Sequence, residues 1–210
     1  MQTVLITGAS AGFGKLVAEK LLAKGYTVYA AARRVEKMRD LESLGAHIMH
    51  MDVTDTESVN AGVAKVIEEQ QRIDVLFNNA GYGSYGTIED VPLEEIQRQY
   101  DVNVFGMGRL VQAVLPQMRK QGSGRIINTA SVVGHVSTAV LGWYASTKHA
   151  VEAFSDALRM EVKALGIDVV VIEPGAVKTE FDEVAFATLD SLDHAEDYKP
   201  LVAAFRQFTG

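Results

Sequence analysis

The chain has 210 residues, of which 48% are hydrophobic and 22% charged, a composition typical of a globular domain with a sizeable core. Its formal net charge of −7 argues against binding to nucleic acid or to an anionic membrane surface, because both need basic patches. The absence of cysteine excludes disulfides, thiol catalysis and thiolate metal sites.

Short apolar runs rich in β-branched residues alternate with segments of helical periodicity. Most of these runs are continuously apolar, as expected of strands that helices cover on both faces. The predicted strands are Thr3–Thr7, Thr27–Ala32, His47–Met51, Val75–Asn78, Arg125–Thr129 and Asp168–Glu173. The predicted helices are Phe13–Ala23, Val35–Leu44, Thr56–Gln71, Leu93–Met118 and Tyr144–Leu165. This alternation predicts a single doubly wound (Rossmann-type) α/β domain, with a parallel sheet and helices on both faces.

The last part of the chain departs from this pattern. From Glu180 to Gly210 the sequence is polar and acidic with scattered aromatic residues, which predicts one or two loosely defined helices and no further strand. We therefore expect residues 1–180 to form the main domain and residues 181–210 a helical tail of it. No apolar run is long enough for a membrane span and no signal-peptide pattern is present, so we expect a cytoplasmic protein.

A glycine-rich turn, in the stretch TGASAGFGK, follows the first predicted strand. Gly8, Gly12 and Gly14 lack Cβ atoms, so a ligand can come close to the backbone there. The helix that follows would point free N–H groups and the positive end of its dipole at an anion such as a pyrophosphate. Ser10 is suited either to cap this helix or to bind a phosphate. A plain strand-to-helix turn is the alternative to a nucleotide site.

Two arginines follow the second predicted strand. A coenzyme with a free ribose 2′-hydroxyl is usually held by an acidic residue about 20 residues after the glycine turn, but the chain has Arg33 and Arg34 in this region. Guanidinium groups suit a phosphate, so the sequence favours NADP(H) over NAD(H). The alternative is a pair of solvated arginines, although cations at a helix start oppose the helix dipole.

Polar residues from three separate segments are expected at the carboxyl edge of the sheet, where doubly wound domains bind ligands. Tyr144 and Lys148 lie one helical turn apart, and Ser131 follows the fifth strand. Asn103 lies in the helix after the fourth strand, which ends in NNAG. A hydride-transfer site needs such a set, with Tyr144 moving a proton and Ser131 donating to the substrate oxygen. We expect Lys148 and an oxidised nicotinamide to lower the pKa of the Tyr144 phenol.

Together these motifs make the chain similar to the short-chain dehydrogenase/reductase family, including its hydroxysteroid dehydrogenase and carbonyl reductase members. The resemblance covers Gln2 to about Phe181, with TGASAGFG, NNAG, YASTK and PGAVKT in the family's order. It implies the sheet order 3-2-1-4-5-6 and a proton relay made of Asn103, Ser131, Tyr144 and Lys148. The candidate cofactor-binding residues are Gly8, Ser10, Gly12, Phe13, Gly14, Arg33, Arg34, Asp52, Val53, Asn79, Ala80, Gly81, Tyr144, Lys148, Pro174, Gly175, Val177 and Thr179.

The resemblance also implies individual roles within this set. Asp52 would reach the adenine amino group, and Val177 with Thr179 would hold the nicotinamide carboxamide. Arg33 would read the 2′-phosphate, and Asn103 would hold a water linked to the lysine.

Two departures from the family's pattern stand out. Family members normally continue into a further helix and a seventh strand, and the residues after Phe181 are too few for both, so the seventh strand is expected to be missing. The edge strand Asp168–Glu173 would then be uncovered. Ala11 stands where some NADP-preferring relatives carry a basic residue, which leaves the phosphate preference to Arg33 and Arg34.

The segments expected around the substrate, VVGHVSTAVLGW and YGSYGTI, are mostly apolar, which favours a hydrophobic ketone, aldehyde or secondary alcohol. Trp143 and Tyr82–Tyr85 would either flank the substrate or wedge under a loop. The alternative functions are a non-catalytic NADP(H)-binding sensor or interaction module, and an epimerase or dehydratase that keeps its nicotinamide bound.

Two further expectations concern partners and metals. The helix from Tyr144 has two apolar stripes, one with Val151, Phe154 and Leu158 and one with Ala150, Ala153, Ala157 and Met160, which favours a homodimer or homotetramer. The five histidines show no ligand-like pairing with carboxylates along the sequence, so we expect no metal site.

Overall fold

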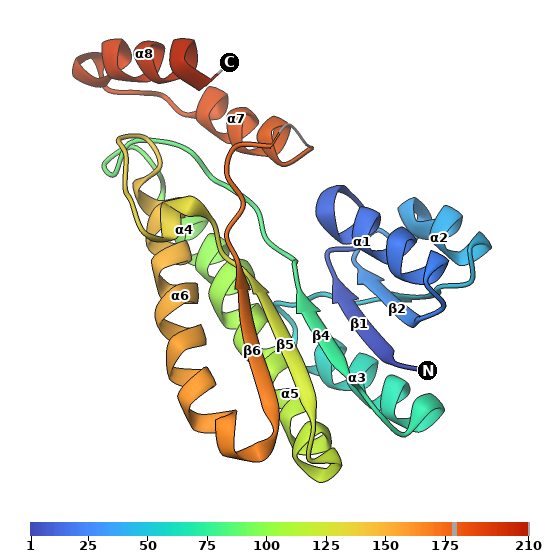
Figure 1. Ribbon diagram of the computed structural model, residues 1–210. Helices are drawn as coiled ribbons and strands as arrows, with labels where there is room; N and C mark the ends of the chain where they lie inside the picture. Colours follow the sequence, from blue (N-terminus) through green and yellow to red (C-terminus); the bar gives the residue numbers. More distant parts are fainter. Residues whose placement is uncertain (178–179, 210) are drawn as a thin grey trace.

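The computed structural model describes residues 1–177 and 180–209, and its centre is one parallel sheet of six strands (Figure 1). The strands are β1 (Thr3–Thr7), β2 (Thr27–Ala32), β3 (His47–His50), β4 (Val75–Asn78), β5 (Gly124–Thr129) and β6 (Ile167–Ile172). Their order across the sheet is β3-β2-β1-β4-β5-β6, which confirms the expected topology. From β1 the chain first adds β2 and β3 on one side and then β4, β5 and β6 on the other side. In doubly wound sheets the crevice for a ligand opens at this switch point, between β1 and β4.

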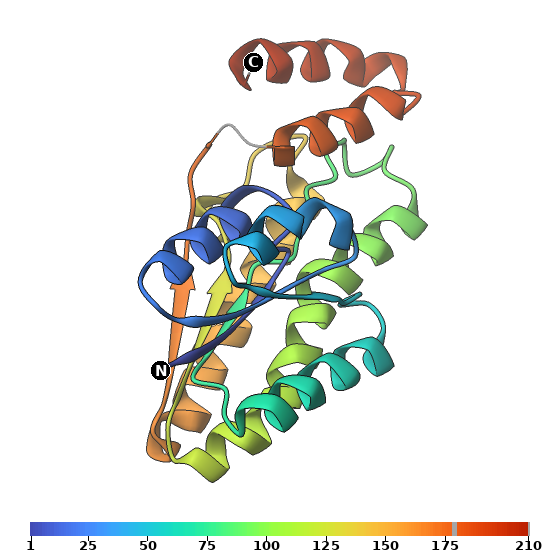
Figure 2. The same ribbon diagram turned by 90° about the vertical axis from the view of Figure 1, so that its right-hand side faces the viewer.

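Helices cover both faces of the sheet (Figures 1 and 2). They are α1 (Gly12–Ala23), η1 (Val35–Met38), α2 (Arg39–Ser43), α3 (Thr56–Gln70), α4 (Leu93–Tyr100), η2 (Asp101–Gly106), α5 (Met107–Gln121), η3 (Val132–Gly134), α6 (Gly142–Val162), η4 (Lys163–Leu165), α7 (Glu180–Ser191), η5 (Glu196–Tyr198) and α8 (Lys199–Thr209). The packing cores place α1 and α2 on one face and α3, α5 and α6 on the other. The predicted helix Leu93–Met118 is divided by η2, a turn of π-helix.

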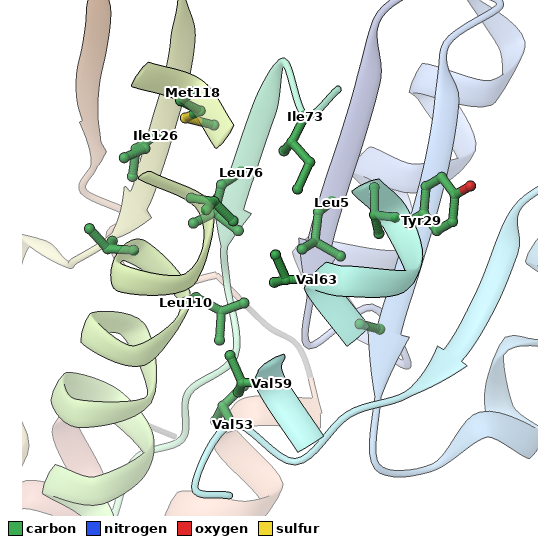
Figure 3. Packing of buried hydrophobic residues seen from close by; sticks show 14 of the residues in the cluster. Leu5, Tyr29, Val53, Val59, Val63, Ile73, Leu76, Leu110, Met118 and Ile126 are labelled. Carbon is green, nitrogen blue, oxygen red and sulfur yellow. The ribbon is translucent and has the colours of Figure 1, made fainter. Parts of the chain in front are cut away.

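The core explains why the strands are apolar along their whole length. Leu5, Leu76 and Ile126, from three neighbouring strands, are fully buried against α3 and α5 (Figure 3). The next residues along β1 and β4, Ile6 and Phe77, pack on the opposite face beneath α1 and α2. Because both faces are covered, each successive side chain of these strands is buried, and alternating polarity is absent.

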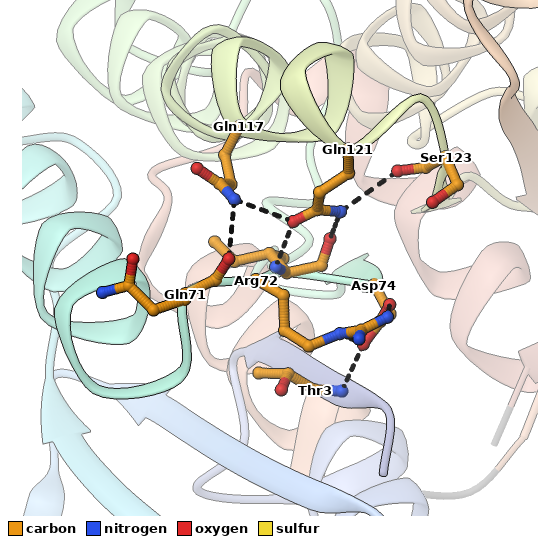
Figure 4. Close-up of polar contacts among 8 residues, drawn as sticks. Thr3, Gln71, Arg72, Asp74, Gln117, Gln121 and Ser123 are labelled. Carbon is orange, nitrogen blue, oxygen red and sulfur yellow. Dashed lines mark hydrogen bonds and ion pairs between the residues drawn. The ribbon is translucent and has the colours of Figure 1, made fainter.

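Polar side chains fix the amino ends of the strands, on the side of the sheet away from the strand carboxyl ends (Figure 4). The buried Asp74 carboxylate accepts hydrogen bonds from the Thr3 backbone at 2.7 Å and from Arg72 Nε at 2.9 Å. The Gln121 amide accepts from and donates to the Ile73 backbone, both at 2.9 Å. These bonds tie β1, β4 and the end of α5 together. They stabilise the sheet at the end opposite to the strand carboxyl ends.

One edge of the sheet is open. In the described part of the chain β6 pairs with β5 on one side and with no strand on the other, which confirms the expected uncovered edge and a six-stranded sheet. Val170 and Ile172 of β6 are 40% and 41% exposed.

The outer surface of α6 is also exposed. Met160 of the second apolar stripe is 76% exposed, while Val151 and Leu158 of the first are buried. The structure contains one chain, so the homodimer or homotetramer stays a prediction. Within residues 1–177 and 180–209, every helix is too short or too polar to cross a membrane.

Candidate active site

Helices α7 and α8 lie beyond the carboxyl ends of the strands (Figures 1 and 2). A cleft of about 1240 Å³ is lined by residues that follow the strands and by residues of these two helices. The predicted site residues that line it are Gly8, Ser10, Gly12, Phe13, Arg33, Arg34, Asp52, Val53, Asn79, Ala80, Gly81, Ser131, Tyr144, Lys148, Pro174, Gly175 and Val177. Gly14 and Asn103 are buried and do not line the cleft, and Thr179 lies outside the described residues. Segments far apart in the sequence therefore meet in a single cleft.

The glycine turn between β1 and α1 is packed too closely for side chains. A Cβ on Gly14 would lie 2.5 Å from the Gly8 carbonyl oxygen, and a Cβ on Gly8 would lie 2.9 Å from the Ala80 Cα. Gly12 has a left-handed φ of +53° and nothing within 4 Å of its missing Cβ, so its backbone faces open space. The N-cap of α1 is Ala11, and no side chain caps the helix. The capping role considered for Ser10 is therefore wrong, and the first N–H groups of α1 are available to an anion.

Two side chains that the sequence analysis did not assign to this purpose hold the turn in place. The Thr7 hydroxyl accepts hydrogen bonds from the backbone N–H groups of Asn79 and Ala80, both at 3.1 Å. The Asn79 side-chain amide donates to the carbonyls of Thr7 and Gly8, both at 3.3 Å. Asn79 was expected to line the cofactor, and it also fastens the end of β4 to the end of β1. Thr7 is the first residue of the TGAS motif, so the motif could have pointed to its role in holding the turn.

A positively charged corner lies beside the glycine turn. Arg34 Nη2 donates to Ser10 Oγ at 3.4 Å, and Arg34 and Lys37 lie 3.9 and 3.8 Å from the Glu180 carboxylate. Arg33 is exposed and lines the same cleft. This corner holds a hydroxyl, three cations and one carboxylate, so its charge is positive on balance and suits a phosphate group.

Asp52 is fixed at the neighbouring wall of the cleft. Its carboxylate accepts from the Thr54 backbone at 3.0 Å and from the Thr54 hydroxyl at 2.7 Å. Burial opposes ionisation, but the Thr54 hydrogen bonds and the charge of Arg33 outweigh it and lower the pKa of Asp52. The residue is therefore an ionised acceptor, as the expected contact with an amino group requires.

Tyr144, Lys148 and Ser131 meet at the centre of the cleft. Lys148 Nζ lies 5.6 Å from the centroid of the Tyr144 ring and donates to the Thr129 carbonyl at 2.8 Å. Ser131 Oγ donates to the Pro174 carbonyl at 3.2 Å, which ties the end of β5 to the segment after β6. All three side chains come from elements anchored in the core, so their mutual positions are set by the sheet and by α6.

Burial dominates the titration of both helix residues. It raises the pKa of the Tyr144 phenol above its ordinary range; nearby Tyr85 adds to the rise, and a hydrogen bond with Ser131 opposes it. It lowers the pKa of the Lys148 ammonium to about 8. In the chain alone the lysine therefore does not acidify the phenol. The expected lowering stays a prediction for the complex with an oxidised nicotinamide.

Replacing Lys148 by Met should stabilise the coenzyme-free chain at pH 7 by about 1 kcal/mol. The lowered pKa of Lys148 corresponds to a cost of about 3 kcal/mol for keeping the buried ammonium charged, and loss of the charge-assisted hydrogen bond to Thr129 offsets about 2 kcal/mol of the gain. Because the folded-state pKa is depressed, the cost is fully present below pH 8 and disappears as the pH rises to about 10.5. Urea unfolding of the parent and the variant at pH 7 and at pH 10.5 measures this cost. An equal gain in stability at both pH values would contradict the lowered pKa of Lys148.

Asn103 lies in the π-helical turn η2 and is 4% exposed. Its side-chain amide donates to the Tyr82 carbonyl at 2.8 Å and to the Thr147 hydroxyl at 3.2 Å, and its oxygen accepts from the Tyr82 N–H at 3.0 Å. It thus joins the segment following NNAG to α6 behind the cleft. The expected water beside this amide stays a prediction.

The other half of the cleft is aromatic and is roofed by α7 and α8. Tyr85 packs edge-on against Tyr144, Phe186 and Phe205, with ring centroids 6.1, 5.6 and 5.9 Å away, and Phe181 lies 5.5 Å from Tyr144. The expected one or two C-terminal helices are confirmed as α7 and α8, with the short η5 between them. Tyr144 therefore stands between the glycine turn on one side and an apolar chamber on the other.

A half-buried histidine–carboxylate contact fastens this roof to the loop before α4. His194 Nδ1 lies 2.9 Å from the Asp90 carboxylate and Nε2 lies 3.0 Å from the Leu189 carbonyl. Trp143 donates to the Ile88 carbonyl at 3.2 Å and does not line the cleft, whereas Tyr82 and Tyr85 do. These aromatic residues were expected either to flank the substrate or to wedge under a loop. Trp143 wedges under a loop. No pattern along the sequence indicated the contact between Asp90 and His194, because the two residues are 104 positions apart.

The family model for short chain dehydrogenase matches residues 2–190 of the chain. The chain belongs to the short-chain dehydrogenase family. This short-chain dehydrogenase spans about two thirds of the length of several curated relatives that it matches.

The relatives of this short-chain dehydrogenase include named reductases. It is 39% identical over 201 residues to the 3-ketodihydrosphingosine reductase of Bacteroides thetaiotaomicron, covering 94% of this chain and 73% of that protein. It is 40% identical over 190 residues to the NADPH-dependent 3-dehydrocapnine reductase of Ornithobacterium rhinotracheale, covering 86% and 67%. A solved serine dehydrogenase complexed with NADP⁺ in its closed form superposes with a TM-score of 0.86, at 34% identity, covering 90% of this chain and 78% of that one.

Proposed function

We propose that the protein is an NADP(H)-dependent oxidoreductase that interconverts a hydrophobic ketone or aldehyde and the corresponding alcohol. The observation that carries this proposal is the position of Tyr144, between the open glycine turn and the aromatic chamber, with Lys148 and Ser131 beside it. A protein that only senses a nucleotide has no need of a phenol, an ammonium and a hydroxyl grouped at the boundary between two pockets.

The residues present fit a dinucleotide. The uncapped start of α1 and the open backbone at Gly12 suit a pyrophosphate, and Asp52 suits an amino group on the adenine side. The cleft is large enough for a dinucleotide with a substrate beside it. When bound, the nicotinamide supplies or accepts the hydride at the substrate carbon.

The side chains of the protein manage the proton. In the reduction direction Tyr144 donates its phenolic proton to the substrate oxygen, and in oxidation it takes the proton back. Ser131 turns its hydroxyl from the Pro174 carbonyl toward that oxygen and stabilises the charge that develops there. Lys148, fixed by the Thr129 carbonyl, lies beside the phenol and would make loss of the proton easier once an oxidised nicotinamide is bound in the cleft.

The aromatic chamber supports a hydrophobic substrate. Its lining includes Tyr85, Phe181, Phe186 and Phe205, and these rings would bury an apolar chain next to the reacting carbonyl. The names of the two reductases reported above support a keto group as the reactive function. We infer a carbonyl carried on an apolar chain as the substrate class.

Mixing the protein with NADPH or NADH and a panel of ketones and aldehydes of increasing chain length tests this function. Loss of the reduced-nicotinamide absorbance should be fastest with NADPH, and kcat/KM should rise with chain length, because each buried CH₂ contributes about 0.8 kcal/mol. Tight NADPH binding without turnover of any substrate would favour the sensor function instead.

Arg33→Asp should weaken NADPH binding about 100-fold and change NADH binding by less than about threefold. The variant replaces a cation by an anion that repels the 2′-phosphate, and a charge-assisted hydrogen bond contributes about 1.5–3 kcal/mol. Quenching of intrinsic fluorescence by each coenzyme measures both constants. Arg39→Asp is the control, because Arg39 is exposed on α2 and pairs with Glu42. Equal losses for both coenzymes would remove Arg33 from the proposed role.

A further inference from the structure

A histidine and two glutamates from three separate segments meet behind the catalytic side chains. His135 Nε2 lies 3.2 Å from a Glu173 carboxylate oxygen and 3.8 Å from Glu152 Oε1. One ligand atom from each residue lies within 4.8 Å of the other two. His135 follows η3, Glu152 lies on α6 and Glu173 follows β6.

The two distances from the imidazole are close to those between ligands of a tetrahedral metal ion. Nitrogen and oxygen ligands bind Zn²⁺ at about 2.0–2.2 Å, so ligand atoms around one ion lie roughly 3.2–3.6 Å apart. The distances of 3.2 and 3.8 Å from His135 Nε2 reach this range with small side-chain rotations. His135 and Glu173 have side chains 55% and 43% exposed, so an ion has a path from solvent and a water can complete the coordination.

Glu152 provides an independent reason to expect a cation. Its side chain is 14% exposed, and its Oε1 is buried without a hydrogen-bond partner among the described residues. This is the oxygen that faces His135. A buried carboxylate oxygen without a donor is costly, and a metal ion satisfies it.

The backbone leaves room for this carboxylate. A Cβ on Gly134 would lie 3.1 Å from Glu152 Cγ and 3.3 Å from its Oε1, so the glycine lets the loop after η3 lie against α6. The next charged neighbours, Asp156 and Arg159, pair with each other. With a neutral imidazole the group carries two uncompensated negative charges, which matches a divalent cation.

We propose that His135, Glu152 and Glu173 form a binding site for a divalent transition-metal ion, with Zn²⁺ the best match to one imidazole and two carboxylates. The ion would cross-link the segment after Ser131, the turn of α6 after Lys148 and the residue before Pro174. It is a structural site beside the catalytic residues, and it takes no part in hydride transfer. The site goes beyond the proposed oxidoreductase function, and its test is independent of that function.

Calorimetric titration of the full chain, without a polyhistidine tag, with ZnCl₂ tests the site. We expect one ion per chain, with Zn²⁺ bound more tightly than Mg²⁺ because of the imidazole ligand. At zinc roughly 100 times the Kd, the melting temperature should rise by about 5 °C or more. His135→Gln and Glu173→Gln should each weaken zinc binding at least about tenfold, since loss of even a supporting residue around a metal costs roughly 10- to 100-fold.

Two control variants make the result specific. His50→Gln removes an exposed histidine of β3, and Glu161→Gln removes an exposed carboxylate of α6; both should bind zinc as the parent chain does. Circular dichroism and the melting temperature without zinc check that all variants fold. The proposal is overturned if the parent chain binds no zinc at millimolar concentration, or if zinc binds His135→Gln and Glu173→Gln as tightly as the parent. Neither result depends on turnover.

Discussion

Tyr144→Phe should reduce kcat for carbonyl reduction by about 10²- to 10⁴-fold and leave the Kd for NADPH within about threefold of the parent value. The substitution removes one hydroxyl, the group that transfers the proton, and keeps the ring that packs against Tyr85 and Phe181. The apolar surroundings of the ring already oppose the ionised form, so a phenylalanine fits without strain. Steady-state kinetics with NADPH and coenzyme binding by fluorescence separate the two effects.

Tyr26→Phe is the matched control for this experiment. Tyr26 packs against the core formed by α1, α2 and the sheet, away from the cleft, so its hydroxyl should not affect kcat. Turnover by Tyr144→Phe at more than about a tenth of the parent rate would show that another group supplies the proton. A parallel loss of NADPH affinity would instead show that the phenol mainly holds the coenzyme.

Gly14→Ala should destabilise the chain by roughly 1–3 kcal/mol and weaken NADPH binding by at least about tenfold. The new methyl group would lie 2.5 Å from the Gly8 carbonyl oxygen and 2.6 Å from the Asn79 side-chain nitrogen. Both atoms belong to the network that holds the turn, so relief of the clash must move the turn itself. Alanine favours a helix over glycine by about 1 kcal/mol, and net destabilisation therefore means that the clash outweighs this gain. Urea unfolding and coenzyme titration measure the two effects.

Gly108→Ala provides the comparison within another helix. Gly108 lies in α5, and the nearest atom to its added Cβ is Phe154 Cε2 at 4.0 Å, an ordinary contact. This variant should be as stable as the parent or more stable by up to about 1 kcal/mol, with unchanged NADPH binding. If Gly14→Ala behaved in the same way, close packing would not be the reason for glycine in the turn.

The sequence predicted the sheet well because its central strands, β1, β2 and β4, are buried on both faces. Continuous apolar runs such as Val4-Leu5-Ile6 have no other common explanation, and the predicted strand bounds agree with the structure to within one residue. The residues just after the strands were found for a related reason, since the carboxyl ends of parallel strands must meet at one edge.

What the sequence did not predict depends on contacts between distant segments. Thr7 with Asn79, Asp90 with His194, and Glu173 with His135 are neighbours only after the chain has folded. A local sequence pattern does not predict contacts between residues so far apart along the chain. The raised pKa of Tyr144 was missed for the same reason, because Tyr85 and the roof of α7 and α8 bury the phenol from far along the chain.

The π-helical turn η2 has a consequence for how this protein tolerates changes of length. An α-helix turns by about 100° per residue, whereas η2 takes up an extra residue between α4 and α5 and presents Asn103 to Tyr82. Because the wide turn absorbs that residue, deleting one residue here would restore a regular helix and keep the buried side of α4, with Ile96 and Gln99, in phase with α5. The Asn103 amide would lose its direction toward Tyr82, so the extra residue serves the position of one amide and not the packing of the two helices.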